Sequence, residues 1–68
     1  MGTGQTRGQV IRSQRQLLGM TQIQLAEAVG LHQSTISSLE QGKHEAPIST
    51  LERVADALRL PVSALLSV

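Results

Sequence analysis

Two short helical segments separated by a three-residue turn constrain the fold of this chain more than any other feature. Residues 22–29 repeat apolar side chains at helical spacing, and Thr21, followed three residues later by a glutamine, forms the capping-box pattern that starts a helix. Gly30 suits the end of that helix, and residues 33–41 carry a second helical pattern. The spacing therefore predicts two helices joined by a tight turn over residues 30–32.

The second of these helices has two chemically different sides. A rotation of about 100° per residue places Ile36, Leu39 and Glu40 on one side of it. Small polar groups without charge fall on the opposite side, which holds Ser34, Ser37, Ser38 and Gln41, with Gln33 projecting from the first turn. Hydroxyl and amide groups can hydrogen-bond to the edges of bases in the major groove. The pattern predicts a helix-turn-helix that binds double-stranded DNA.

Helical patterns also cover most of the remaining chain. A first helix is predicted from about Gly8 to Leu18, with an apolar stripe that includes Leu17. Gly19 is expected to end this helix in a left-handed cap. Ser49 and the glutamate three residues later form a second capping box, which predicts a helix over residues 50–58. Pro61 is expected to start a fifth helix that ends at Leu66, and residues 1–7 are expected to form a flexible arm. We therefore predict an all-α fold of five short helices.

Composition limits the other classes of protein. The 68 residues make one domain at most, and without any aromatic residue the core must be built from Leu, Val, Ile, Ala and Met. The first ten residues lack the apolar stretch of a signal peptide, and no apolar run approaches the roughly 20 residues that span a bilayer. The absence of cysteine is compatible with the reducing cytoplasm. The net charge is +1, but residues 1–15 alone carry +3. That basic end could meet phosphate or could simply be solvated.

The residues that carry these patterns resemble a known family in order and spacing: Thr21-Gln22, Leu25-Ala26, Gly30, Ser34-Thr35-Ile36-Ser37, Glu40, Gly42-Lys43, residues 51–58 and Leu65-Leu66. They are similar to the lambda-repressor-like helix-turn-helix domains, of the Cro/C1 or xenobiotic-response-element type. The resemblance covers about residues 8–66, which is nearly the whole chain. It implies a DNA-binding transcriptional regulator, of repressor type, that works as a homodimer on a palindromic operator.

The resemblance also implies roles for individual residues. In similar proteins the glutamine after the second helix's cap contacts a phosphate and braces the first glutamine of the recognition helix; here these positions are Gln22 and Gln33. A glutamine can bind adenine through N6 and N7, so Gln33 is the leading base-reading candidate. The other groove-facing positions are Ser34, Ser37 and Ser38. Thr21 and Lys43 are candidates for phosphate contact, and Arg15 and Glu40 are expected to form an ion pair that holds the recognition helix.

Three positions depart from the family pattern. His32 stands where the family has a capping serine, so the start of the recognition helix is less firmly held. Arg59 stands where a glycine usually follows the fourth helix, so either this arginine adopts a strained conformation or the turn differs. The groove-facing set is rich in serine, and serine pairs with several bases, which predicts modest or water-assisted discrimination between sequences.

The remaining alternatives concern the end of the chain and the class of function. Val62, Leu65, Leu66 and Val68 are more apolar than a chain end needs, so the fifth helix with its neighbours either forms the homodimer surface or closes the core. The main rival to DNA binding is a protein-interaction module, such as an antitoxin or adaptor, on the same scaffold. His32, His44, Glu40 and Glu45 are better explained as surface residues than as metal ligands. No enzyme and no cofactor is expected, because the chain has no cysteine nucleophile and no glycine-rich phosphate loop.

Overall fold

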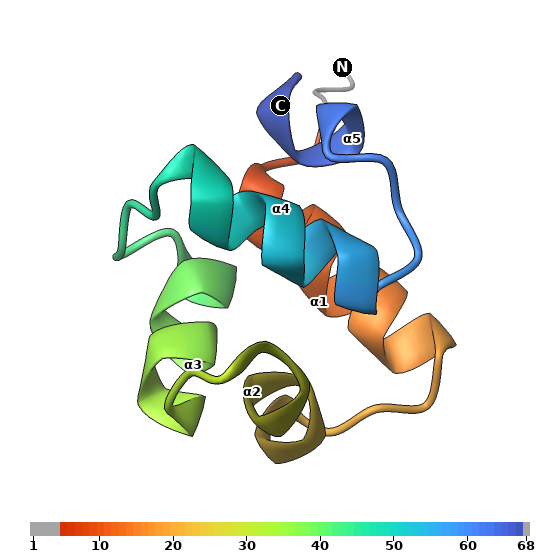
Figure 1. The fold of residues 1–68 in the computed structure, drawn as a ribbon, viewed down its shortest axis with the longest axis vertical. Coiled ribbons are helices and arrows are strands. Elements are labelled where there is room, and N and C mark those ends of the chain that lie inside the picture. Colours follow the sequence, from red (N-terminus) through yellow and green to blue (C-terminus); the bar gives the residue numbers. More distant parts are fainter. Residues whose placement is uncertain (1–4, 68) are drawn as a thin grey trace.

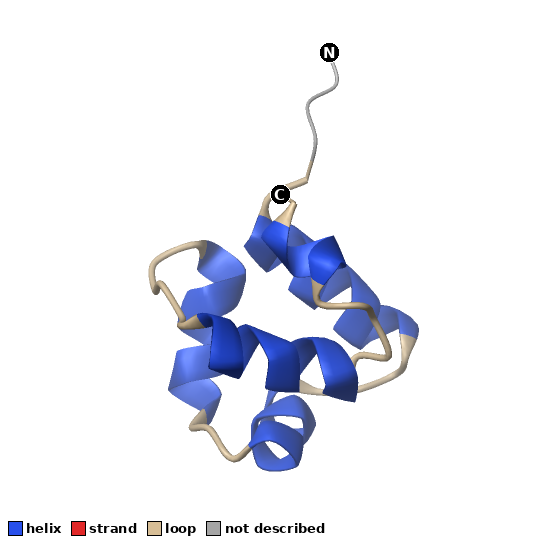
Figure 2. Ribbon diagram, turned by 45° about the horizontal axis from the view of Figure 1, so that its top comes forward, coloured by secondary structure: helices blue, strands red, loops and turns tan. Residues whose placement is uncertain are grey.

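The computed structural model describes residues 5–67, and these residues form five helices and no strand. Figure 1 shows their arrangement, and Figure 2 shows the same helices connected only by loops and turns. The predicted all-α fold of five short helices is confirmed. In chain order the helices are α1 (Arg7–Leu17), α2 (Gln22–Val29), α3 (Gln33–Gln41), α4 (Ile48–Ala57) and α5 (Ser63–Leu66).

The start of α1 lies earlier than the sequence suggested. Thr6 is its N-cap and forms a complete capping box with Gln9, and Arg7 is its first residue. These two residues therefore belong to the helix and not to the expected arm; residues 1–4 of that arm lie outside the described part of the chain. The Arg7 side chain also donates a hydrogen bond from Nε to the carbonyl oxygen of Leu65, 2.8 Å away, which joins α1 to α5.

The far end of α1 corrects a second expectation. Leu17 was predicted to join the buried stripe, but 78% of its surface is exposed. Leu17 follows the buried Ile11 by six positions, and at about 100° per residue this places Leu17 on the solvent side of the helix. Gly19 follows with φ of 73°, the left-handed conformation that was predicted for it.

The helix α4 also begins earlier than predicted, and the expected Ser49 capping box does not form. Pro47 is the N-cap, with φ of −65° and ψ of 160°, and no side chain caps this helix. Its carbonyl oxygen accepts hydrogen bonds from the backbone N–H groups of Thr50 and Leu51, both at 3.0 Å. Ser49 is therefore already inside the first turn, where it cannot act as the cap.

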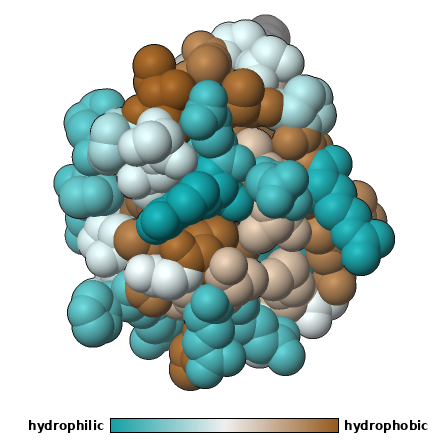
Figure 3. Space-filling view, viewed as in Figure 1, coloured by the Kyte–Doolittle hydropathy of each residue, from teal (hydrophilic) through white to brown (hydrophobic). Residues whose placement is uncertain are grey.

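The helix α5 is shorter than predicted because Pro61 and Val62 form a turn before it. Within α5, Leu65 is fully buried, so for this residue the alternative that closes the core is correct and it is not available for a dimer surface. Val68 lies outside the described residues. Leu66 is exposed and Val62 is partly buried. Apolar side chains gather on the visible face of the molecule around α5 and the beginning of α4 (Figure 3).

One aliphatic core joins all five helices. It contains residues of helices α1 to α5 and the C-cap of α4: Ile11, Leu25, Ala26, Val29, Ile36, Leu39, Leu51, Val54, Ala55, Leu58 and Leu65. The pair α2 and α3 packs against two other elements, since α3 lies against α1 and α2 lies against α4 (Figure 1). The core thus fixes the helix-turn-helix from two sides.

None of the helices among residues 5–67 is long and apolar enough to cross a membrane.

Candidate nucleic-acid interface

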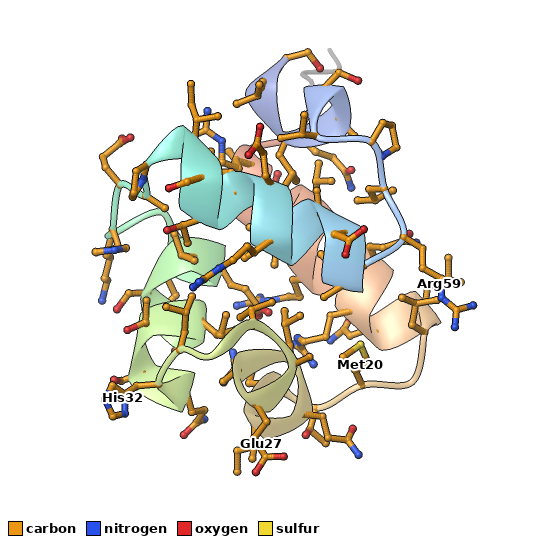
Figure 4. All side chains as sticks on the ribbon, viewed as in Figure 1. Met20, Glu27, His32 and Arg59 are labelled. Carbon is orange, nitrogen blue, oxygen red and sulfur yellow. The ribbon has the colours of Figure 1, made fainter. Side chains whose placement is uncertain are left out.

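The turn between α2 and α3 sets the direction of the second helix. Gly30 adopts a left-handed conformation, with φ of 73°, and its backbone N–H donates to the carbonyl oxygen of Ala26. His32 is the N-cap of α3, but its side chain makes no capping hydrogen bond. Figure 4 shows the His32 side chain directed away from the body of the molecule at this turn. The start of α3 therefore lacks the side-chain cap that would ordinarily stabilise it by about 1 kcal/mol.

The outer side of α3 carries the groups that the sequence singled out for base contact. Gln33 and Ser34 are exposed, while Ser37 and Ser38 are partly buried. The exposed Gln41 donates a hydrogen bond from Nε2 to Oγ of Ser37, 2.8 Å away. All five side chains are uncharged, so this side of the helix offers hydrogen-bonding groups and no charge of its own.

Two of the three candidates for phosphate contact, Thr21 and Lys43, lie at opposite ends of the helix pair, and the third, Gln22, is partly buried. Thr21 is exposed and caps α2: its hydroxyl accepts from the backbone N–H of Gln24, while the Gln24 side chain accepts from the backbone N–H of Thr21. Lys43 is exposed just beyond the C-cap of α3, and its backbone N–H donates to the carbonyl oxygen of Ser38. This exposed lysine thus stands at the C-terminal end of α3.

A buried carboxylate connects three helices on the inner side of α3. The Glu40 side chain has no exposed surface. Its Oε2 accepts from Nε of Arg15 at 2.7 Å, and its Oε1 accepts from Nη2 of the same arginine at 3.1 Å. Arg15 also donates from Nη1 to the carbonyl oxygen of Met20 at 2.8 Å. The structure thus brings Arg15 and Glu40 together, and the two-point contact limits rotation of α3 relative to α1.

Two further side chains donate to Oε1 of Glu40, the oxygen that also accepts from Nη2 of Arg15. Nε of Arg12 lies 3.3 Å from Oε1 of Glu40, and Nε2 of Gln22 lies 3.1 Å from it. Oε1 of Gln22 in turn accepts from Nε2 of Gln33 at 3.1 Å. The glutamine at the start of α3 is therefore connected to the core through the glutamine at the start of α2.

These contacts account for the ionisation of Glu40. Burial alone raises the pKa of this carboxyl group, but hydrogen bonds from Arg15, Gln22 and Arg12, together with the charge of Arg15, outweigh that effect. The net result is a pKa below the ordinary value of 4.5. Glu40 is ionised at neutral pH, and the two arginines beside one carboxylate leave a local charge of +1.

Sequence reasoning missed two residues of this site. Arg12 lies three residues before Arg15, and this spacing on one side of a helix was the signal for a second partner of Glu40. Gly8 is buried where α1 crosses α3, and a Cβ atom added there would lie 2.3 Å from the carbonyl oxygen of Glu40. Its signal was a glycine inside a helical pattern without a capping role, which often marks a close approach.

The histidines and acids do not converge. Among residues 5–67, no group of three or more His, Asp or Glu side chains is placed to hold a metal ion. His44 and Glu45 lie in the exposed loop before α4, and Glu45 is 4.0 Å from Nη1 of Arg7. That ion pair is at the surface, where such pairs contribute little to stability.

Comparison with known proteins places this arrangement in a family. The helix-turn-helix family matches residues 11–65. The immunity repressor protein of Bacillus phage phi105 is 42% identical over 60 residues, which are 88% of this chain and 42% of that repressor. The chain therefore spans less than half the length of this relative.

Solved structures show the same fold. The P22 c2 repressor in complex with a synthetic operator aligns with a TM-score of 0.86 and 29% identity, over 91% of this chain and 94% of that one. SinR, the master regulator for biofilm formation, was solved in complex with DNA and aligns with a TM-score of 0.82 and 35% identity, over 90% and 98% of the two chains. This chain belongs to the lambda-repressor-like, Cro/C1-type helix-turn-helix family of DNA-binding transcription regulators.

Proposed function

We propose that this chain recognises a specific sequence in double-stranded DNA by placing α3, residues 33–41, in the major groove, and that it acts as a repressor-type regulator of transcription. The observation that carries the proposal is the Gln33 amide, which is exposed at the start of α3 and held in place by Gln22. An exposed amide that is already fixed loses little conformational freedom on binding a base.

The contacts divide into two kinds. Base contact is assigned to Gln33, Ser34, Ser37 and Ser38, because their hydroxyl and amide groups occupy the outer side of α3. Phosphate contact is assigned to Thr21 and Gln22 at the start of α2, and to Lys43 beyond α3. The backbone N–H groups at the N-termini of α2 and α3 add further donors for phosphate. Arg15 and Glu40 are assigned the structural role of holding α3 in orientation.

The proposal includes a homodimer on a palindromic operator. The exposed Leu66 in α5, the partly buried Val62 just before it and the exposed Ile48 at the start of α4 supply apolar surface. Two recognition helices related by a two-fold axis would contact half-sites about 34 Å apart, one turn of DNA. The chain would work in the cytoplasm, on the nucleoid, without a cofactor and without a catalytic role.

Selection from a pool of random duplexes tests this function directly. We expect enrichment of a sequence with two related halves spaced by one helical turn, and binding that weakens as salt rises, because phosphate contacts release counterions. The Glu52→Gln variant, which changes an exposed side chain of α4, is expected to select the same sequence and serves as the control. A chain that binds no duplex even at low salt would instead favour a protein-interaction module on the same scaffold.

A further inference from the structure

Three side chains form a series of hydrogen bonds from the core to the exposed start of α3. It begins at the buried carboxylate of Glu40, passes to Gln22 over 3.1 Å and ends at Gln33 over another 3.1 Å. The first member has no exposed side-chain surface, whereas the last is exposed. A charged group inside the molecule is thus two hydrogen bonds away from the side chain assigned to base contact.

The chemistry of these groups determines which side chain donates and which accepts in each hydrogen bond of the series. An ionised carboxylate can only accept hydrogen bonds, so Gln22 must turn its NH₂ group toward Glu40. Its carbonyl oxygen then faces Gln33, which must donate one of its two N–H bonds. The lowered pKa of Glu40 keeps the carboxylate ionised at neutral pH, so this direction is constant there.

The direction determines what Gln33 can offer to a base. One N–H of its amide is engaged with Gln22, so one N–H donor and the carbonyl acceptor remain, and neither has a partner among residues 5–67. Adenine presents a donor at N6 and an acceptor at N7, which match this pair. Guanine presents two acceptors, N7 and O6, so the carbonyl oxygen of Gln33 would face a lone pair. If Gln22 donated to Gln33 instead, both N–H bonds of Gln33 would be free, and these two donors would match the two acceptors of guanine.

We propose that Glu40 is a specificity-determining positioning residue: through Gln22 it orients the Gln33 amide so that α3 prefers adenine over guanine at one position of the DNA site. This inference rests on the proposed function, since it requires that Gln33 contacts a base. The buried ion pair then has a second consequence beyond holding α3 in orientation, because an ionised carboxylate cannot donate and so fixes the direction of these hydrogen bonds.

The test measures the ratio of affinities for two duplexes that differ by adenine or guanine at a single position. That position is the one at which Gln33→Ala loses its base preference in the selection. If no position responds to Gln33→Ala, the proposed base contact fails; if one does, the role of Glu40 can be judged separately. A good bidentate contact sets the wild-type ratio at roughly 5- to 150-fold.

The first variant is Glu40→Met, which removes the acceptor for Gln22 at nearly the same volume, so that the Gln22 amide can turn either way. An amide at residue 40 would not serve, because Arg12 and Arg15 would hold its oxygen where Oε1 now lies. We expect the adenine preference to fall several-fold in the folded protein, while the control Glu52→Gln keeps the wild-type ratio. A purely structural role would lower thermal stability and overall affinity but leave the ratio unchanged, and a wild-type ratio in folded Glu40→Met overturns the proposal.

The second variant moves the carboxylate along the chain. In Glu40→Met combined with Gln22→Glu, residue 22 can only accept, so Gln33 must again donate to it. We expect this double variant to regain the adenine preference that Glu40→Met loses. A double variant with the same ratio as Glu40→Met overturns the proposal, because the acceptor at residue 22 should restore the direction.

A third comparison covers a Glu40→Met variant that does not fold. Gln22→Met removes the hydrogen bond to Gln33 at nearly the same volume and leaves the Glu40 ion pair in place. We expect Gln22→Met to lose the adenine preference, whereas Gln16→Met, on the exposed side of α1, keeps it and controls for the added thioether. A wild-type ratio in Gln22→Met overturns the proposal.

Discussion

The helices α3 and α4 are nearly equal in length, and each buries three of its residues, but the buried groups differ. Those of α4 are Leu51, Val54 and Ala55, all aliphatic. Those of α3 include the charged Glu40, which accepts hydrogen bonds from Arg15, Arg12 and Gln22. Apolar burial is not directional, whereas a hydrogen bond fixes the orientation of both partners.

This difference corresponds to what each helix has to do. The helix α4 packs its apolar side against the core, and none of its three buried side chains has a polar group that must meet a partner. The helix α3 must hold its outer side at one orientation, because a groove contact depends on where each donor and acceptor points. The comparison predicts that changes in α4 act on stability alone, and that changes around Glu40 act on stability and base preference together.

The largest effect is expected for Leu58→Ala at the C-cap of α4. Leu58 has no exposed surface, and removal of its side chain leaves a cavity that should lower the free energy of unfolding by about 2–5 kcal/mol. Chemical denaturation measures this loss, and the base preference of the folded fraction should be unchanged. Leu17→Ala, with 78% of the leucine exposed, is the matched control and should cost less than about 0.5 kcal/mol. An altered base preference in Leu58→Ala would contradict the division between the two helices.

The next effect is expected for Gly8→Ala, where α1 crosses α3. The added Cβ would lie 2.3 Å from the carbonyl oxygen of Glu40, so the two helices must separate, at a cost of about 1–3 kcal/mol. The exposed Ser13 on the same helix provides the control, since Ser13→Ala adds no contact. If Gly8→Ala melts at the temperature of the wild type, the close crossing of α1 and α3 is wrong.

A smaller effect of opposite sign is expected for Arg59→Gly after α4. Arg59 has φ of 61°, and Figure 4 shows its side chain at the edge of the molecule. A left-handed conformation costs a side chain about 1–2 kcal/mol, and part of this is regained with glycine, which should stabilise the protein by up to about 1 kcal/mol. Arg53→Gly, inside α4, should instead destabilise it by about 1 kcal/mol. Destabilisation by both variants would mean that Arg59 is not strained.

The smallest effect is expected as a dependence of stability on pH. Because folding lowers the pKa of Glu40 below 4.5, its contribution to stability is complete above that value and is lost as the pH falls through the folded pKa. The difference in melting temperature between wild type and Glu40→Gln should therefore shrink as the medium becomes more acidic. A difference that stays constant from neutral pH to pH values well below 4.5 would contradict the lowered pKa.

Local chemistry explains which parts of the fold could be predicted from the sequence. The limits of α2 and α3 follow from the Thr21 capping box and from two glycines in left-handed turns, and each of these signals involves only neighbouring residues. Arg59 was expected either to be strained or to alter the turn, and it has the positive φ of the first case. The predicted start of α4 was wrong because the capping-box pattern indicated Ser49 as the N-cap, whereas the N-cap is Pro47, two residues earlier.

The connections within the site were less accessible because they join residues far apart in the chain. The pairing of Arg15 with Glu40 was implied only by resemblance, and Arg12 was missed because nothing local shows which side chains share one carboxylate. The direction of the hydrogen bonds from Glu40 to Gln33 depends on how α2 lies against α3, since Gln22 is in α2 and the other two residues are in α3. The sequence lists the donors and acceptors, but their order appears only in the folded chain.

The most direct test of the account compares the selected DNA sequences of the wild type and Gln33→Ala at fixed salt, together with their melting temperatures. We expect Gln33→Ala to lose about 1–3 kcal/mol of affinity for the wild-type site and to lose base preference at one position in each half-site, with no change in melting temperature. Identical selected sequences and equal affinity in the two proteins would contradict base recognition through the start of α3.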